Sequence, residues 1–290
     1  MSSSVVTAYV DGRYLPLAEA RVSPMDRGFL FGDGAYEVIP VYSRRAFRLD
    51  EHVARLANTL GAMRLANPHA AEEWKALILE LVARNPWDDQ SVYLQVTRGA
   101  DTKRNHAFPG PEVKPTVFLM SEPLVTPSAG QRASGIAAVS AADIRWLRCD
   151  LKTVSMLANC LLRQHAIDQG CMETVLFRDS FLTEGAASSI FVCKDGVLLV
   201  PPKSHLMLPG ITYDVVLELA RSHGMKHAVR EVLEAEVRSA DELWMTSSTK
   251  EVLAITTLDG RPVGDGKPGP MGRQMHAWYQ DFKNTVMRNG

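Results

Sequence analysis

The segment that matters most in this chain reads Ile144-Arg145-Trp146-Leu147-Arg148-Cys149-Asp150-Leu151-Lys152, and it ends in a lysine. Apolar residues follow, and we predict a helix from Thr153 to Gln169 that Gly170 ends. The other lysines of the chain lie in polar, charged or turn-rich surroundings. A lysine held rigid and partly desolvated at such a junction has a lowered pKa, which frees its amine to form a Schiff base. A solvated surface lysine remains the alternative, because that is the usual setting of this residue.

Segments on both sides of Lys152 alternate between strand and helix patterns. The first half predicts a hairpin about Asp11-Gly12, strands at 36–42, 92–97 and 116–120, a helix capped by Asp50 and a helix from about 70 to 82. The second half predicts strands at 136–139, 173–177, 189–192 and 243–246, a hairpin turn at Asp195-Gly196 and a helix at 212–223. We therefore expect an α+β fold with two mixed domains, 1–121 and 133–290, joined by a linker at 122–132.

Composition and charge exclude several classes of partner. The 290 residues are 46% hydrophobic and 22% charged, as in ordinary globular proteins. A formal net charge of -1 gives no reason to expect nucleic acid or an anionic membrane as partner, and no stretch has the apolar length of a membrane span. The four cysteines form no CxxC pair and no zinc-type cluster, so we expect free thiols, no metal and a cytoplasmic protein.

Three features are suited to binding an anion. Pro209-Gly210-Ile211-Thr212 opens a predicted helix, whose free N–H groups and positive end favour a phosphate. Thr246-Ser247-Ser248-Thr249 follows a strand and offers hydroxyl and N–H groups. Arg55 lies beside the apolar stripe of its helix, where it can present a bidentate fork to a phosphate. Simple caps, a turn and an arginine that covers the core with its stem are the alternatives.

A single acid stands out from its neighbours. Glu184 lies in Thr183-Glu184-Gly185-Ala186-Ala187-Ser188-Ser189, where the surrounding residues are too small to fill space. A carboxylate in this setting indicates a close partner, while an exposed loop acid is the alternative.

Several segments, in a fixed order, carry a resemblance that covers the chain from about Tyr9 to Phe282. They are Asp26-Arg27-Gly28 with Phe31-Gly32-Asp33-Gly34-Ala35-Tyr36-Glu37, Glu51-His52 with Arg55-Leu56, Asp143 to Lys152, and Thr183-Glu184-Gly185 with Pro209-Gly210-Ile211-Thr212. In these segments the chain resembles the fold-type IV aminotransferases, which depend on pyridoxal 5'-phosphate (PLP). The resemblance implies two mixed α/β domains, an active site between them that a neighbouring subunit completes, and therefore a homodimer.

The resemblance also implies roles for individual residues. Lys152 is similar to the catalytic lysine that forms the PLP aldimine, and Glu184 to the acid that pairs with the pyridine nitrogen. The other residues implied to bind the cofactor are Arg55, Ile211, Thr212, Ser247, Ser248 and Thr249 at the phosphate and Leu208 against the ring. Two serines of the usual run after Glu-Gly are Ala186 and Ala187 here, which removes hydroxyls near the cofactor.

A polar loop between two predicted strands suggests the substrate. Gln95-Val96-Thr97-Arg98-Gly99, followed by Arg104-Asn105-His106, resembles the D-amino-acid aminotransferases, in which an arginine, a histidine and a tyrosine hold the substrate carboxylate. The corresponding residues here are Arg104, His106 and Tyr36, and the loop before Arg104 is one residue longer than usual. The implied reaction is ping-pong transamination between a D-amino acid such as D-alanine and 2-oxoglutarate or pyruvate.

Other activities on the same fold remain open at this point. They are branched-chain L-amino-acid transamination, R-selective amine transamination and the aminodeoxychorismate lyase reaction, all of which start from the same lysine. A PLP-binding protein without turnover is the alternative that is not an enzyme. The sequence does not give the preferred amino acid, the acceptor, the rate, the pathway or the residues of a dimer interface.

Overall fold

The computed structural model describes residues 6–289, which form two compact units. The first unit holds the residues up to Val125 together with the short segment Leu151–Met156. The second unit holds Thr126–Asp150 and the residues from Leu157 onward. Lys152 therefore belongs to the first unit, although the residues on both sides of its segment belong to the second.

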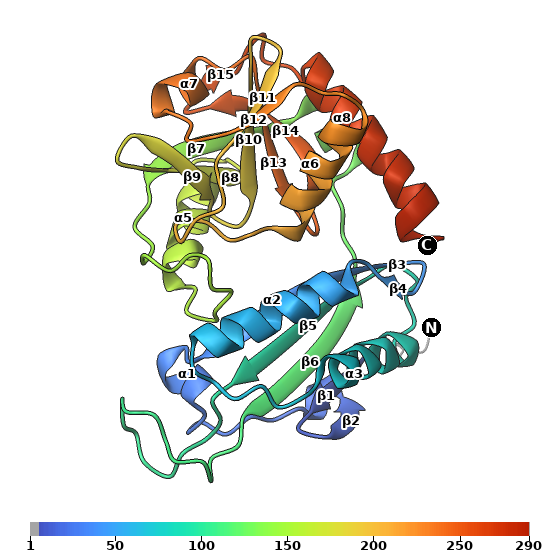
Figure 1. Cartoon of the computed structure of the whole chain (residues 1–290), viewed down its shortest axis with the longest axis vertical. Helices are drawn as coiled ribbons and strands as arrows, with labels where there is room; N and C mark the ends of the chain where they lie inside the picture. Colours follow the sequence, from blue (N-terminus) through green and yellow to red (C-terminus); the bar gives the residue numbers. More distant parts are fainter. Residues whose placement is uncertain (1–5, 290) are drawn as a thin grey trace. The chain divides into compact units, whose positions relative to one another are not determined.

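The first unit is a six-stranded antiparallel sheet, with its strands in the order β2-β1-β6-β5-β3-β4. Its elements are β1 (Thr7–Val10), β2 (Arg13–Pro16), a 3-10 turn (Leu17–Glu19), α1 (Arg27–Phe31), β3 (Gly34–Tyr42), β4 (Arg45–Ala46), α2 (Leu49–Ala62), α3 (Ala71–Arg84), β5 (Gln90–Thr97) and β6 (Thr116–Pro123). Helices α2 and α3 lie across one face of this sheet (Figure 1). The predicted hairpin at Asp11-Gly12 is confirmed, and both turn residues have the positive φ that such turns require.

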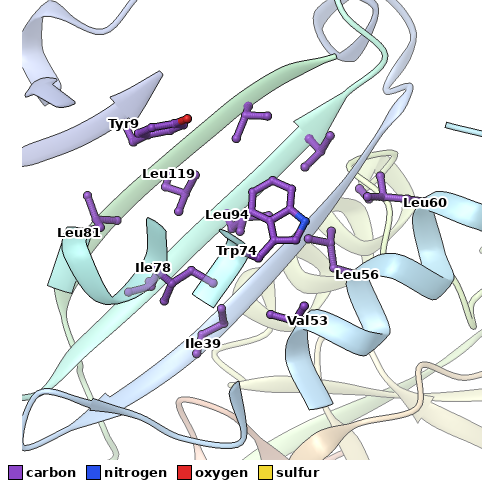
Figure 2. Close-up of a cluster of buried hydrophobic side chains, with 14 of the residues drawn as sticks. Tyr9, Ile39, Val53, Leu56, Leu60, Trp74, Ile78, Leu81, Leu94 and Leu119 are labelled. Carbon is purple, nitrogen blue, oxygen red and sulfur yellow. The ribbon is translucent and has the colours of Figure 1, made fainter. Parts of the chain in front are cut away.

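The core of the first unit lies between these two helices and the sheet. Figure 2 shows Trp74 of α3 among Leu56 and Leu60 of α2 and Leu94 of β5, and all four side chains are fully buried. The apolar positions of α2 recur at helical spacing and those of β5 alternate, so each element turns one apolar face inward. This packing fixes β3, the strand that carries both Tyr36 and Glu37.

The second unit is a nine-stranded mixed sheet in the order β12-β11-β10-β13-β14-β7-β8-β9, with β15 paired to β14. Its elements are α4 (Ala129–Ser134), β7 (Ile136–Ala142), α5 (Leu157–Asp168), β8 (Glu173–Arg178), β9 (Phe181–Gly185), β10 (Ser189–Lys194), β11 (Val197–Val200), α6 (Ile211–Ser222), β12 (His227–Val229), α7 (Glu234–Arg238), β13 (Glu242–Ser247), β14 (Glu251–Leu258), β15 (Arg261–Pro262), α8 (Pro270–Phe282) and a π-helical turn (Lys283–Met287). Helices α6 and α8 pack on each other and on β13 (Figure 1). Helix α5 packs on β7 and β8. In residues 6–289, no helix combines the length and the apolar character needed to cross a membrane.

Two sequence predictions about helix starts are wrong. The helix predicted from Thr153 begins only at Leu157, because the backbone before it pairs with β3 instead. The N–H of Tyr36 donates to the carbonyl of Lys152, and the N–H of Val154 donates to the carbonyl of Gly34, both at 2.9 Å. Asp50 lies in the first turn of α2 rather than at its cap. From that position its carboxylate pairs with Lys75.

Candidate functional site

Glu184 is the most informative residue of the second unit. The structure places it near the end of β9 rather than in a loop, and only 4% of the residue is exposed. Its Oε1 accepts a hydrogen bond from Nη1 of Arg145 and one from the N–H of Leu208, the latter at 3.2 Å. Burial raises the pKa of the Glu184 carboxyl to about 7 even though Arg145 lies beside it.

The second oxygen of Glu184 is not used in the same way. Both hydrogen bonds fall on Oε1, and no residue of the described chain donates to Oε2. A buried carboxylate that is satisfied on only one oxygen favours a further donor or a positive charge near the other. A protonated ring nitrogen is such a group, so the donor set at Glu184 fits the pyridine end of PLP.

Arg145 is held in place by an acid that the sequence prediction did not assign to the site. Asp143 accepts from Nε and Nη2 of Arg145, both at 2.9 Å, and its side chain is completely buried. Asp143 also accepts from the hydroxyl of Thr183, next to Glu184. The short spacing of Asp143 and Arg145 is visible in the sequence. The partner of Arg145 in the site, Glu184, lies 39 positions further along the chain, beyond the reach of a local pattern.

The segment after Leu208 leads directly into an anion-ready helix start. Helix α6 begins at Ile211, its cap Gly210 forms no side-chain hydrogen bond, and Thr212 lies in the first turn. The N–H groups of this turn therefore keep their capacity to bind an anion, with the positive end of the helix behind them. The predicted cradle residues Ile211 and Thr212 thus follow Leu208, which itself touches Glu184.

The end of β13 lies next to this helix start. A Cβ built on Gly210 would lie 3.1 Å from the hydroxyl oxygen of Ser189, and Ser189 pairs across strands with Thr246. The hydroxyl of Thr246 is buried and has no hydrogen-bond partner among residues 6–289. In the turn that follows, the hydroxyl of Ser247 accepts from the N–H of Lys250 at 3.1 Å. The structure thus gathers two of the anion-ready segments of the second unit, the α6 start and the β13–β14 turn that holds Ser247, Ser248 and Thr249.

In the first unit, Lys152 lies over an aromatic ring. Its Nζ is 4.1 Å from the centre of the Tyr36 ring, and it forms no ion pair within residues 6–289. The ring of Tyr36 is stacked on that of Tyr93, with 5.7 Å between the ring centres. Backbone hydrogen bonds join Lys152 to β3, so the amine and the tyrosine are fixed to one strand. The Lys152 amine is held over a ring and has no carboxylate partner in the described chain. This setting fits the role of a nucleophile better than the role of a surface charge.

Arg55 is anchored by a buried acid, Glu37. Nε and Nη2 of Arg55 donate to the two oxygens of Glu37, each at 2.7 Å, and Nδ1 of His52 lies 2.8 Å from one of them. Burial opposes ionisation of Glu37, but Arg55 and His52 outweigh it and lower the pKa of its carboxyl to about 2. Burial also lowers the pKa of His52. The sequence prediction assigned no role to Glu37 or His52, although both lie in the motif segments.

Arg104 and His106 lie in the exposed loop between β5 and β6. The guanidinium of Arg104 and the ring of His106 are 5.0 and 5.3 Å from the ring centre of Phe31. Arg27 donates to the backbone carbonyls of Asn105 and His106, which orders the tip of the loop. In the described chain neither side chain forms a hydrogen bond or an ion pair with Tyr36, so these interactions do not link the three residues predicted to bind the substrate within one copy.

The chain matches the family model described as amino-transferase class IV over residues 34–258. It is 37% identical over 271 residues to a D-alanine aminotransferase of Bacillus licheniformis, covering 93% of this chain and 95% of that protein. The chain belongs to the class IV aminotransferases. A D-alanine aminotransferase of Listeria innocua is 36% identical over 93% of both chains. The branched-chain amino acid aminotransferase of Escherichia coli has the same fold, with a TM-score of 0.87, 22% identity and coverage of 99% of this chain and 96% of that one.

The pair Glu37–Arg55 predicts a pH dependence of stability in this class IV aminotransferase. Because the pKa of Glu37 falls from 4.5 to about 2 on folding, its contribution is complete above pH 4.5 and is lost as the pH falls through 2. That contribution is about 3 kcal/mol. We expect Glu37→Gln to lower the free energy of unfolding by about 3–5 kcal/mol at pH 7 and by much less near pH 2. Urea unfolding followed by circular dichroism measures this, with the exposed Glu19→Gln as control. A Glu37→Gln deficit that does not change with pH contradicts the assignment.

Proposed function

We propose that this chain is a PLP-dependent D-amino-acid transaminase. It moves an amino group between a D-amino acid, such as D-alanine, and a 2-oxo acid, 2-oxoglutarate or pyruvate. The observation that carries the proposal is the buried Glu184, with one oxygen held by Arg145 and Leu208 and the other without a donor in the described chain. Relatives described as D-alanine aminotransferases support the D-amino-acid substrate. The product of the first half-reaction leaves before the second substrate binds, which gives ping-pong kinetics.

The predicted cofactor residues divide between the ring and the phosphate of PLP. Glu184 and Leu208 meet the ring, while the α6 start at Ile211 and Thr212 binds the phosphate. The other phosphate ligands in this proposal are Arg55, Ser247, Ser248 and Thr249. When bound, PLP supplies an electron-withdrawing ring that stabilises negative charge on the substrate Cα. Glu184 contributes by favouring a proton on the ring nitrogen, because its carboxylate is buried and has a single cationic neighbour.

Lys152 has two tasks in the proposal. Its Nζ would hold the cofactor covalently, and when free the same nitrogen would accept the proton from the substrate Cα and hold it for return. The Tyr36 ring under the amine keeps it aimed in one direction. The short segment Leu151–Met156, bonded to β3, gives the lysine a rigid base.

Reduction should identify Lys152 as the attachment site. We expect sodium borohydride to fix PLP to the peptide that contains Lys152 and to no other lysine. Lys152→Ala should lose the label and at least about 10³-fold in kcat, since the proton-transfer group is gone. Peptide mass mapping reads out the label. Lys250→Ala, in the predicted phosphate turn, is the control that keeps it. A label on any lysine other than Lys152 overturns the assignment.

The class of substrate follows from the loop that holds Arg104 and His106. An arginine, an imidazole and the Tyr36 hydroxyl together suit an α-carboxylate, because charge-assisted bonds fix both its charge and its orientation. An amine substrate without a carboxylate gains nothing from this arrangement. These side chains therefore favour an amino-acid transaminase over an amine transaminase.

A substrate panel tests the activity itself. We expect D-alanine with 2-oxoglutarate to give a kcat/KM at least about tenfold above that of L-leucine, L-valine or (R)-1-phenylethylamine. A coupled assay of the keto product measures this. Faster turnover of L-leucine moves the chain to branched-chain transamination. Bound PLP without turnover of any amine leaves only a binding protein.

We also propose that the chain acts as a homodimer in which Arg104 and His106 serve the active site of the second copy. Their loop is exposed, and in residues 6–289 neither side chain forms a hydrogen bond or an ion pair with Tyr36. In the second unit, Ile144, Trp146 and Leu147 are at least half exposed, which is unusual for three apolar residues so close in sequence and suits a protein partner.

The free cysteines Cys149, Cys160, Cys171 and Cys193 support a reducing, cytoplasmic setting.

Mixing two impaired variants tests both parts of this arrangement. If Arg104 acts in the second copy, a heterodimer of Lys152→Ala with Arg104→Ala has one site with both residues intact. Random reassociation of equal amounts should then restore about a quarter of the wild-type sites. If Arg104 acts within its own copy, no site is restored. D-Alanine turnover after co-refolding measures the outcome.

The same variants check the carboxylate role. Arg104→Ala alone should lower kcat/KM for D-alanine by about 10- to 100-fold, the worth of a charge-assisted bond, and leave a simple amine unaffected. Lys103→Ala is the matched control, because it removes a neighbouring charge from the same loop. Impairment of Lys103→Ala alone shifts the carboxylate contact to Lys103. Impairment of neither variant places the contact elsewhere.

A further inference from the structure

Glu251 occupies an unusual position at the end of the β13–β14 turn. Its φ is +56°, a conformation that favours glycine, and the turn it closes contains the predicted phosphate residues Ser248 and Thr249. Ser247 and Glu251 pair across the two strands, so the backbone of Glu251 is one of the two supports of the turn. The side chain is completely buried. A buried acid at a position that favours glycine indicates that the carboxylate itself is needed there.

The carboxylate of Glu251 accepts hydrogen bonds from three helical elements. Lys283 Nζ donates to Oε1 at 2.7 Å, and Arg132 Nη2 and Gln280 Nε2 each donate to Oε2 at 2.8 Å. Arg132 comes from α4, Gln280 from α8 and Lys283 from the π-helical turn after α8. The ring of His276 on α8 also interacts electrostatically with Glu251 and with its two cationic partners. Two cations and an amide donor on one buried carboxylate satisfy both of its oxygens and make a rigid anchor.

Helix α8 also supports the other part of the predicted phosphate cradle, the start of α6. Helix α8 packs against α6, whose first turn holds Ile211 and Thr212, and against β13 and β14 (Figure 1). Thus α8 contacts the helix that supplies the N–H groups and, through Glu251, holds the turn that supplies the hydroxyl groups. The separation of these two phosphate-binding elements depends on one common support.

We propose that Glu251 is a positioning residue for the cofactor phosphate: its anchor to Arg132, Gln280 and Lys283 holds the Ser248–Lys250 turn at the distance from the α6 start that a phosphate ester requires. This rests on the proposed function, because it assumes PLP in that cradle. Glu251 itself does not touch the phosphate, since its two oxygens are directed to the three donors. Its loss should therefore weaken recognition of the phosphate group and spare recognition of the ring.

The measurement compares PLP with pyridoxal, which has the same ring and no phosphate. Both dissociation constants are determined on purified apoenzyme by absorbance titration, and inorganic phosphate is tested as a competitor of PLP. For Glu251→Gln we expect the dissociation constant of PLP to rise about tenfold or more, that of pyridoxal to change less than about twofold, and phosphate to compete more weakly. Gln280→Leu, which removes one neutral donor, should shift the PLP constant in the same direction by a smaller factor.

Glu242→Gln is the matched control within the same unit. Glu242 is also a buried acid, and it holds the opposite end of α8 by accepting from the N–H groups of Met271 and Gly272. Its loss should lower the thermal midpoint and leave the ratio of PLP to pyridoxal affinity unchanged. Glu251→Gly separates the backbone from the side chain, because glycine accepts the positive φ but cannot form the anchor. We expect it to behave like Glu251→Gln.

Each outcome bears on a different statement. An unchanged affinity ratio in Glu251→Gln and Gln280→Leu overturns the positioning role. So does an equal fall in Glu242→Gln, because that would reflect general loosening of α8. Wild-type affinity ratios in Glu251→Gly mean that the turn holds itself and the anchor is dispensable. A wild-type chain that binds neither PLP nor pyridoxal contradicts the proposed function instead.

Discussion

The candidate site depends on one constraint: Glu184 is buried, yet only one of its two carboxylate oxygens accepts hydrogen bonds from the described chain. A carboxylate that is 4% exposed needs donors, and the fold supplies them to one oxygen only, from Arg145 and Leu208. Arg145 is fixed in turn by Asp143, which also binds Thr183. One continuous set of ion pairs and hydrogen bonds therefore joins three places: the end of β7, strand β9 and the segment before α6. Because α6 starts three residues after Leu208, the geometry at Glu184 also governs where the anion-ready helix start lies.

The first unit contains a comparable buried acid in the opposite condition. Glu37 is satisfied on both oxygens by Arg55 and on one of them by His52, and the pKa of its carboxyl falls to about 2. The pKa of Glu184 rises to about 7 under similar burial, because a single cation does not offset its desolvation. Burial alone therefore does not distinguish a structural acid from a functional one. The donors differ as well: both oxygens of Glu37 accept hydrogen bonds, whereas in residues 6–289 only Oε1 of Glu184 does.

The sequence predicted much of the fold because most of its signals are local. Apolar periodicity located α2, α3 and α6, and alternation with turn residues located β3, β5, β10 and β13. Local patterns failed where distant backbone competes for hydrogen bonds, as when β3 pairs with the segment around Lys152 and delays the start of α5. An exposed loop acid was the alternative interpretation of Glu184, and long-range strand pairing decides against it by making the residue part of β9. The candidate residues were within reach of motifs, but their partners Asp143, Arg145 and Glu37 depend on contacts that no spacing rule encodes.

The two alanines after Glu184 show how far the fold and the ligand can be separated. Family resemblance leads one to expect serines at Ala186 and Ala187, and a hydroxyl in a tight turn often holds the backbone. Here Glu173 does that work: its Oε1 accepts from the N–H of Ala186 and its Oε2 from the hydroxyl of Ser188. The carbonyl of Ala186 accepts from the side-chain amide of Asn159 on α5. Both polar backbone groups of Ala186 are thus hydrogen-bonded without the missing hydroxyls, because Glu173 and Asn159 supply the partners from outside the turn.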